Sequence, residues 1–466
     1  MNAPVIWLGI PVLAALGLWA IRSEKWTAII GGSLALVLSF LAIAIPIDQA
    51  ILIGNLSIRI SPVYEILGRK FILTSSNQLV LVMIYGIVSF WFFGSGVSRI
   101  SHRLVPLGLL ITALLLGSLA VDPFLYAALL IEMAVLIAIP MLTPPDQKPG
   151  RGVIRFLIFQ TLAMPFILLS GFLLSGVEAS PADINLVIQA AFLLGIGFAF
   201  LLAVFPFYAW IPMISEESPI YAVGFVLMIF PTIGMLFGLS FLDRYTFLRE
   251  SRQLYEILRI IGMLTLVTAG IWAMFQRHIG RIMGYATIIG TSLSILAISL
   301  PSTTTAIGLV FLLIVPRALG LGVWSLALTI MQKQVPSLLF GDLKGQARNL
   351  PFVGAAIVGA ALSLSGIVPF VGFPIQFSLW NNLGEVSVPF GMWFGLGMLG
   401  LVISSLRTLA VLVMSPEKTP WQSIETWTER ILLGIGVVAL VLFGIFPQWT
   451  QIVLANLPSV FEHLGK

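Results

Sequence analysis

Two proline-interrupted apolar stretches decide the fold that this sequence predicts: Val204-Phe-Pro-Phe-Tyr-Ala-Trp-Ile-Pro212 and Ser365-Gly-Ile-Val-Pro-Phe-Val-Gly-Phe-Pro374. A proline lacks an N–H group and leaves a carbonyl one turn earlier without its helical partner. At membrane depth such backbone is tolerated only beside protein, polar side chains or water. We therefore expect two broken helices inside a packed membrane bundle, marked by Pro206, Pro212, Pro369 and Pro374.

The composition around these stretches excludes an ordinary soluble protein. Of the 466 residues, 59% are hydrophobic and only 9% are charged, and the mean hydropathy is +1.07. A soluble domain carries roughly a quarter charged residues. No segment of the chain has that much polar surface, so the expected fold is an all-α polytopic membrane protein.

The apolar runs on either side of the two stretches set the number of membrane spans. A bilayer core takes about 20 apolar residues per helix, which predicts about fourteen spans. The first run, 3–21, lacks a basic segment before it and is read as a retained helix rather than a cleaved signal peptide. The predicted limits are 3–21, 26–47, 77–97, 103–121, 122–142, 153–176, 185–209, 219–242, 254–275, 283–301, 305–331, 352–380, 388–414 and 431–449.

Basic residues at the span ends predict the orientation, because they collect on the cytoplasmic side. With the N-terminus outside, the inner loops hold Arg22, Lys25, Arg99, Arg103, Lys148, Arg151, Arg155, Arg277, Arg281, Lys333, Lys344, Arg348, Lys418 and Arg430. The outer side holds fewer, namely Arg59, Arg69, Lys70, Arg244, Arg249, Arg252, Arg259 and Lys466. We expect both termini on the outer side.

The two proline-interrupted stretches occupy similar places in two groups of five helices. Paired broken helices in corresponding positions are typical of inverted-repeat transporters, whose pathway lies at the repeat interface. The alternative is a pair of ordinary proline kinks. The predicted organisation is N-terminal helices in 1–100, a first five-helix repeat in 101–243, a second in 250–415, and a C-terminal helix and tail in 416–466.

Several kinds of chemistry are excluded by the residue types present. The chain has no cysteine, so disulfides and iron–sulfur clusters are impossible. The histidines, His102, His278 and His463, are far apart and lie in no metal motif. The net charge of +5 is spread between the apolar runs and does not form a nucleic-acid-binding patch. We expect no catalytic residue, bound metal or cofactor in this chain.

Four segments resemble the antiporter-like subunits of respiratory complex I, a family shared with multi-subunit cation/proton antiporters and membrane-bound hydrogenases. Residues 197–212 followed by Glu217-Ser-Pro219 resemble the family's G-x-A-x-K-x-x-x-x-P-x-H-x-W-x-P and E-A-P. Residues 281–290 resemble K-R-x-L-A-Y-S-S-I-S, and 342–351 with 362–373 resemble D-L-x-G-L-A-R-x-x-P and L-S-L-A-G-x-P-P-x-x-G-F. Glu132 is placed like the glutamate of the family's fifth helix. The resemblance covers roughly 100–415.

The resemblance implies a fold of fourteen helices with two inverted five-helix repeats, each containing a broken helix. It also implies a membrane-arm subunit of a larger complex, in which a glutamate and lysines pass protons while other subunits carry the redox chemistry. The implied partners are other membrane subunits of a respiratory or hydrogenase-like complex, the lipid bilayer, and protons or small cations. The implied location is an energy-transducing membrane, with a bacterial cell membrane preferred.

The residues that would relay protons in the family are mostly replaced in this chain. The four lysine positions fall on Leu201, Thr232, Leu321 and Gln376, and the two histidine positions fall on Tyr208 and Arg317. A proton relay needs groups that change protonation near the working pH. Because leucine, threonine and glutamine do not, the family's relay is largely dismantled.

The remaining polar candidates lie inside or near the spans, and two of them, Glu132 and His278, have two interpretations. Glu132 is a protonatable switch or a neutral, hydrogen-bonded acid, and Arg317, which stays protonated, is expected to anchor structure through the Leu312 carbonyl that Pro316 frees. Arg407 is expected to extend to the headgroups. Tyr208 and His278 are placed near the inner boundary, where His278 is a proton entry or a simple interfacial residue. The candidates are Glu132, Tyr208, Glu217, Thr232, His278, Arg317, Gln376 and Arg407.

These observations leave three hypotheses for the function. The first is an antiporter-like membrane-arm subunit of a complex I-like assembly that participates in proton translocation. The second is a non-conducting structural paralogue within such a complex. The third is a stand-alone secondary transporter, which the paired broken helices permit but the four motifs disfavour.

Overall fold

The computed structural model describes residues 2–53, 56–66, 68–97, 100–144, 147–179, 184–414, 420–450 and 456–464. Of the cations used to predict the orientation, Arg99, Lys418 and Lys466 lie outside these ranges.

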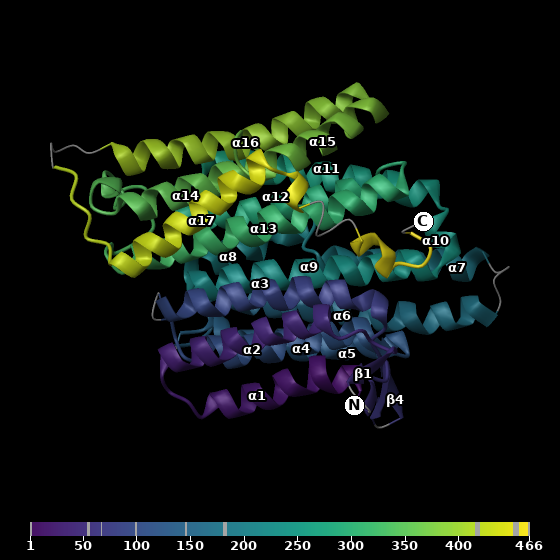
Figure 1. The fold of residues 1–466 in the computed structure, drawn as a ribbon. Helices are drawn as coiled ribbons and strands as arrows, with labels where there is room; N and C mark the ends of the chain where they lie inside the picture. Colours follow the sequence, from purple (N-terminus) through teal and green to yellow (C-terminus); the bar gives the residue numbers. More distant parts are fainter. Residues whose placement is uncertain are drawn as a thin grey trace.

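The described part of the chain is a bundle of helices that follow the predicted apolar runs in order (Figure 1). A short π-helical turn, Val5–Gly9, leads into the first helix. The helices are α1 (Ile10–Trp19), α2 (Glu24–Ala44), α3 (Gln78–Val97), α4 (Leu104–Ala120), α5 (Ala127–Leu142), α6 (Arg151–Ala179), α7 (Ile184–Leu201), α8 (Trp210–Glu217), α9 (Ile220–Arg244), α10 (Thr246–Arg249), α11 (Arg252–Phe275), α12 (Ile279–Ile298), α13 (Thr303–Gln332), α14 (Pro351–Leu364), α15 (Gly372–Val386), α16 (Val388–Val413) and α17 (Trp427–Ile445).

Within the described ranges, ten helices are long and apolar enough to cross a membrane, and four further apolar helices are shorter. The shorter ones are Val5–Trp19, Leu104–Ala120, Asn185–Leu201 and Pro351–Leu364. Two of them, α7 and α14, are the first halves of the two broken helices. The chain is therefore a multi-pass integral membrane protein, and the expected apolar runs are present as helices.

The predicted all-α class is confirmed for the bundle, which carries five short strands at its edge. They form two antiparallel sheets, one of β1 (Ala50–Ile53) and β2 (Leu56–Arg59), and one of β3 (Val63–Ile66), β4 (Arg69–Ile72) and β5 (Val121–Asp122). Gly68, with φ +70°, makes the turn between β3 and β4, where a left-handed residue is needed. β1 to β4 lie between the predicted spans 26–47 and 77–97, where the apolar runs are too short to cross a membrane.

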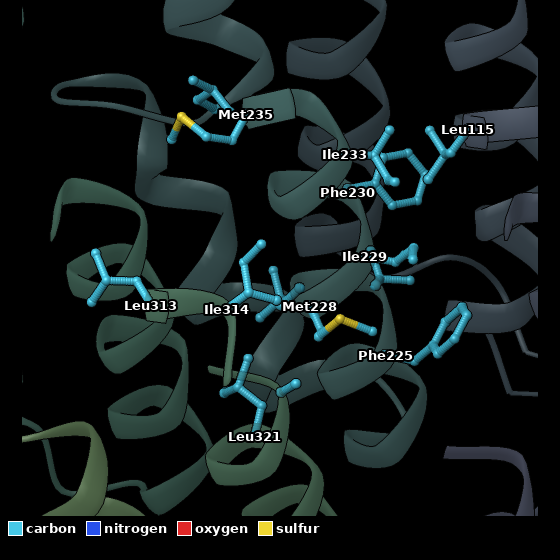
Figure 2. Close-up of a cluster of buried hydrophobic side chains, with 14 of the residues drawn as sticks. Leu115, Phe225, Met228, Ile229, Phe230, Ile233, Met235, Leu313, Ile314 and Leu321 are labelled. Carbon is cyan, nitrogen blue, oxygen red and sulfur yellow. The ribbon is translucent and has the colours of Figure 1, made fainter. Parts of the chain in front are cut away.

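The core of the bundle lies where α9 meets α13. α9 is buried along nearly its whole length, whereas α17 is mostly exposed at the edge of the bundle. Leu321 and Ile314 of α13 lie beside Met228 of α9 in a cluster of buried hydrophobic side chains (Figure 2). This contact joins the N-terminal half of the bundle, in purple to teal, to the C-terminal half, in green and yellow (Figure 1).

Both chain ends lie toward the same end of the bundle as strands β1 and β4 (Figure 1). The segment 462–464 is held there by Asp243 at the end of α9, whose carboxylate accepts hydrogen bonds from three successive backbone N–H groups. The donor–acceptor distances are 3.1, 2.8 and 2.8 Å.

Candidate functional site

The first broken helix stops at Leu201 and starts again at Trp210. Ala203 takes a left-handed conformation, with φ +50°, and the N–H of Val204 donates to the carbonyl of Ala199 at 3.1 Å. This is the bonding pattern of a Schellman helix end. The next free N–H, that of Phe205, donates to the hydroxyl of Thr265 on α11 at 3.0 Å. Polar contacts from neighbouring helices thus satisfy the interrupted backbone.

The second broken helix ends in the same way at Leu364 and starts again at Gly372. Here the left-handed residue is Gly366, with φ +69°, and the N–H of Ile367 donates to the carbonyl of Leu362 at 3.1 Å. Both breaks fall within the predicted proline stretches. Pro206 and Pro369 lie in the gaps between the half-helices, while Pro212 and Pro374 lie in the first turns of α8 and α15.

The second break is also covered by α17. The N–H of Val371 donates to the carbonyl of Leu440 at 2.8 Å. Gly444, one turn further along α17, allows this close approach, because a Cβ there would collide with the Pro369 carbonyl. The edge helix α17 therefore supplies an acceptor that the broken helix lacks.

A glutamine side chain binds the last carbonyl of the first half-helix in both breaks. Gln160 Nε2, from α6, donates to the Leu201 carbonyl at 3.2 Å, and Gln376 Nε2 donates to the Leu364 carbonyl at 3.1 Å. Both side chains are buried, and among the described residues neither Oε1 atom has a hydrogen-bond partner. A neutral amide therefore sits at each point where the helix is interrupted.

The other positions expected to carry the family's lysines are apolar or internally bonded. Leu201 and Leu321 are buried, and Leu321 packs in the hydrophobic cluster between α9 and α13 (Figure 2). Thr232 is buried and donates to the carbonyl of Met228 on its own helix at 2.6 Å. The sequence has no lysine in 149–332 or in 345–417. No lysine is thus available at either break.

Glu132 is the acid that the sequence singled out within a span. Its Oε1 accepts a hydrogen bond from the Thr161 hydroxyl of α6 at 2.8 Å. Its Oε2 is buried and has no hydrogen-bond partner in the described part of the chain. No positive charge pairs with this carboxyl group within salt-bridge distance among the described residues.

Arg317 is almost fully buried in α13, at 5% exposure. Its Nη2 donates to the Thr291 hydroxyl and, at 3.3 Å, to the Thr287 carbonyl, both on α12. The expected bond to the Leu312 carbonyl is absent from this set, because the guanidinium reaches across to the neighbouring helix. Its Nε has no partner in the described residues. Arg317 thus ties α13 to α12 and places a fixed charge beside the second half of the bundle.

Glu217, at the end of α8, anchors the predicted inner end of the first broken helix. Its Oε2 accepts from the N–H of Gly152 at 2.8 Å and so caps the N-terminus of α6. Beside it, Arg281 Nε donates to Glu216 Oε2 at 2.5 Å. The end of α8 is therefore held by two of its own carboxylates, which bind α6 and α12.

His278 lies next to this ion pair as the N-cap of α12, where its Nδ1 accepts from the N–H of Arg281 at 3.3 Å. Burial lowers the pKa of His278 below its usual value, and the Glu216 carboxylate partly offsets this effect. His278 is thus at the helix end, as expected. Tyr208 lies buried in the gap before α8, whose eight residues are about 12 Å long.

Arg407 was expected to extend to the headgroups, but its Nη1 donates to the carbonyl of Met274 at the end of α11. Its guanidinium lies 5.4 Å from the centre of the Phe340 ring.

Gln160, Thr161 and Thr291 were missed by sequence reasoning. The available signal was a polar side chain within a long apolar run.

Comparison with known proteins identifies the family to which this chain belongs. Residues 153–404, more than half of the chain, match the family described as NADH:quinone oxidoreductase/Mrp antiporter, transmembrane. The chain belongs to this family. A family relative, NADH-quinone oxidoreductase subunit N of Bdellovibrio bacteriovorus, is 24% identical over 258 residues. That match covers 53% of this chain and 52% of the relative, so it spans about half the length of the curated protein.

Solved structures of the family's fold match over nearly the full chain. A chain of the archaeal membrane-bound sulfane sulfur reductase complex has a TM-score of 0.83 at 14% identity, covering 100% of this chain and 98% of that one. A chain of respiratory complex I from Thermus thermophilus has a TM-score of 0.77 at 20% identity, covering 99% and 100%. These matches show that the whole chain adopts the antiporter-like fold.

Proposed function

We propose that this chain is an antiporter-like membrane subunit of a complex I-like assembly, and that its own interior is closed to protons. Redox chemistry in this proposal belongs to partner subunits. The observation that carries the proposal is the neutral glutamine amide bound to the interrupted backbone in each broken helix, at Leu201 and at Leu364.

The chemistry at these points supports a closed interior. An amide does not gain or lose a proton near neutral pH, and arginine stays protonated in proteins. The leucines at 201 and 321 are buried and cannot hold water by hydrogen bonds. A relay would need titratable groups in succession along the bundle. The buried residues at the family's lysine positions do not form one.

The matching ends of the two broken helices support the expected organisation in two inverted five-helix repeats, in 101–243 and 250–415. After each first half-helix comes a left-handed residue, and the N–H of the residue that follows it donates to the carbonyl five positions earlier. The last carbonyl of each half-helix accepts a hydrogen bond from a glutamine amide. The proposed orientation keeps both termini on the outer side of an energy-transducing membrane.

Proton translocation is the second candidate, and Glu132 is the observation that favours it. Its Oε2, which is buried and lacks a hydrogen-bond partner in the described residues, belongs to a group that can gain and lose a proton. Changing Glu132 to Gln in the assembled complex separates the two candidates. A closed interior predicts an unchanged number of protons pumped per electron in sealed vesicles, whereas translocation through Glu132 predicts a fall.

Membership of a complex is tested separately. After purification in a mild detergent, we expect the chain to elute together with other membrane and redox subunits. Elution of the intact chain alone, from a host that expresses its neighbouring genes, would contradict the proposed assembly and favour a stand-alone transporter.

A further inference from the structure

The segment 456–464 lies across the place where the two predicted repeats meet, at the end of the bundle that also carries strands β1 and β4 (Figure 1). Its short helical turn, Leu457–Val460, packs against α13 of the second repeat and against α3 of the N-terminal helices. The Phe461 and Leu464 side chains are buried, and the Phe461 ring lies 6.3 Å from that of Phe311 on α13. The segment therefore contacts helices from separate parts of the bundle.

Leu464 fills one end of the seam between the two repeats. The seam is formed by the facing ends of α9, from the first repeat, and of α11, α12 and α13, from the second. Leu464 and six residues of these helices line a cavity of only about 10 Å³, namely Leu239, Leu242, Tyr255, Ile298, Ala306 and Ile307. Such a volume holds no more than about one water. Leu464 thus occupies space that water would otherwise enter.

One carboxylate holds the segment in place. Asp243, at the end of α9, accepts hydrogen bonds from the backbone N–H groups of 462, 463 and 464, and its side chain is only 15% exposed. Successive N–H groups of this kind form an anion-binding nest. In the described part of the chain, every hydrogen bond that joins 456–464 to another segment ends on Asp243. The polar attachment therefore depends on a single side chain.

Asp243 is unfavourably placed within its own helix. It lies in the last turn of α9, and the carbonyl end of a helix carries a partial negative charge that disfavours a carboxylate. Arg249 Nη1 donates to the backbone carbonyl of Asp243, at 2.7 Å. The donors from 462–464 reach the carboxylate itself and offset the unfavourable charge at this helix end.

We propose that segment 456–464 is a releasable clasp over the seam. While Asp243 binds the three N–H groups, Leu464 keeps water out of the seam. When the carboxylate releases these groups, the segment moves aside and the seam opens to the predicted outer side of the membrane. The clasp is a conformational device beyond the proposed function, because it operates whether or not the interior conducts protons.

The chain has no cysteine, so a single introduced cysteine reports access to the seam. Ala306→Cys places a thiol beside Leu464, and the full chain, purified in a mild detergent, is labelled with a charged maleimide. We expect slow labelling in the native background, because Ala306 is only 3% exposed. Adding Asp243→Ala should speed labelling about tenfold or more, since hydrogen bonds to a charged group are lost and local opening becomes more frequent. An unchanged rate would overturn the proposal.

The matched control is Glu462→Ala, which removes a carboxylate from the same segment but keeps the N–H group that donates to Asp243. It should leave the labelling rate at its native value. A second probe, Ala318→Cys, is buried in the middle of α13 and should stay unlabelled when Asp243→Ala is added. Equal rates for the Asp243 and Glu462 variants, or equal gains at the two cysteines, would contradict a local clasp.

If Asp243→Ala does not fold, Leu464→Ala takes its place. This change shortens the side chain that fills the seam and leaves the carboxylate and the three N–H groups intact. It should also speed the labelling of Ala306→Cys, by less than Asp243→Ala would. Labelling at the native rate would show that Leu464 does not exclude water from the seam, and the clasp would be ruled out.

Discussion

The two broken helices of this protein end alike but are closed by different side chains. Around the first gap a pair of aromatic rings, Phe200 and Phe207, lies 4.3 Å apart between centroids, beside the Thr265 hydroxyl that binds the Phe205 N–H. Around the second a pair of hydroxyls, Ser365 and Ser405, has its Oγ atoms 3.0 Å apart. The backbone pattern of a Schellman end plus a glutamine amide is common to both. The geometry of the break thus tolerates very different surroundings, provided that each freed backbone group finds a partner.

Gly366→Ala should disrupt the backbone at the second gap and give the largest loss of stability among these variants. An alanine at this position would have to hold the left-handed backbone conformation of Gly366. Its Cβ would also collide with Gln376 Oε1 and displace the amide from the Leu364 carbonyl. A left-handed non-glycine residue and a buried unpaired carbonyl together cost about 3 kcal/mol. Thermal unfolding of the purified chain, followed by tryptophan fluorescence, measures this loss. A melting temperature equal to that of the native chain would contradict the assigned backbone role.

Removing each glutamine amide tests whether the two gaps depend on it equally. Gln160→Leu and Gln376→Leu each leave a buried carbonyl without a donor, which costs about 1–3 kcal/mol. We expect similar losses of unfolding free energy in the two variants. The double variant should lose the sum, because the two gaps share no residue. A loss at only one site would show that the likeness of the gaps is confined to backbone shape.

Ala203→Gly should stabilise the backbone conformation at the first gap. Ala203 holds a left-handed conformation that costs an L-residue about 1 kcal/mol, and glycine adopts it freely. The variant should therefore raise the unfolding free energy by up to that amount. Ala199→Gly, inside α7, is the control and should be destabilising instead.

His278→Asn tests the anchoring of the first broken helix and should have the smallest effect. Because burial lowers the pKa of His278, the unfolded chain binds a proton there more readily than the folded chain. The native protein therefore loses stability as the pH falls below about 6.5, the ordinary histidine value. Asparagine keeps the N-cap of α12 without this titration. The unfolding free energy of the variant should fall less steeply with decreasing pH than that of the native chain. Parallel curves would contradict the lowered pKa of His278.

The spans and the two breaks could be predicted from the sequence because their causes are local. Long apolar runs and prolines act through the backbone of their own segment, and the gaps fall between Leu201 and Trp210 and between Leu364 and Gly372. The antiparallel strands of 50–72 could not be predicted in this way. Their apolar runs are short, and their pairing depends on contacts such as that of β4 with β5, far along the chain.

The partners of the polar residues were the part that sequence could not supply. Arg317 was expected to bond to its own helix, yet it reaches Thr291 of α12. Gln160 carries the same role as Gln376 but lies on a helix that is not broken, so no motif marks it. Such pairs form only after helices pack, and a single sequence records the residues without recording which faces meet.

Through the hydrogen bond from Val371 to Leu440, α17 shields the interrupted backbone of the second broken helix. A chain that stopped before Trp427 would leave that N–H group facing hydrocarbon, where no water can replace the lost acceptor. Such a truncated chain would keep every residue of its second broken helix and still be unable to hold it in place.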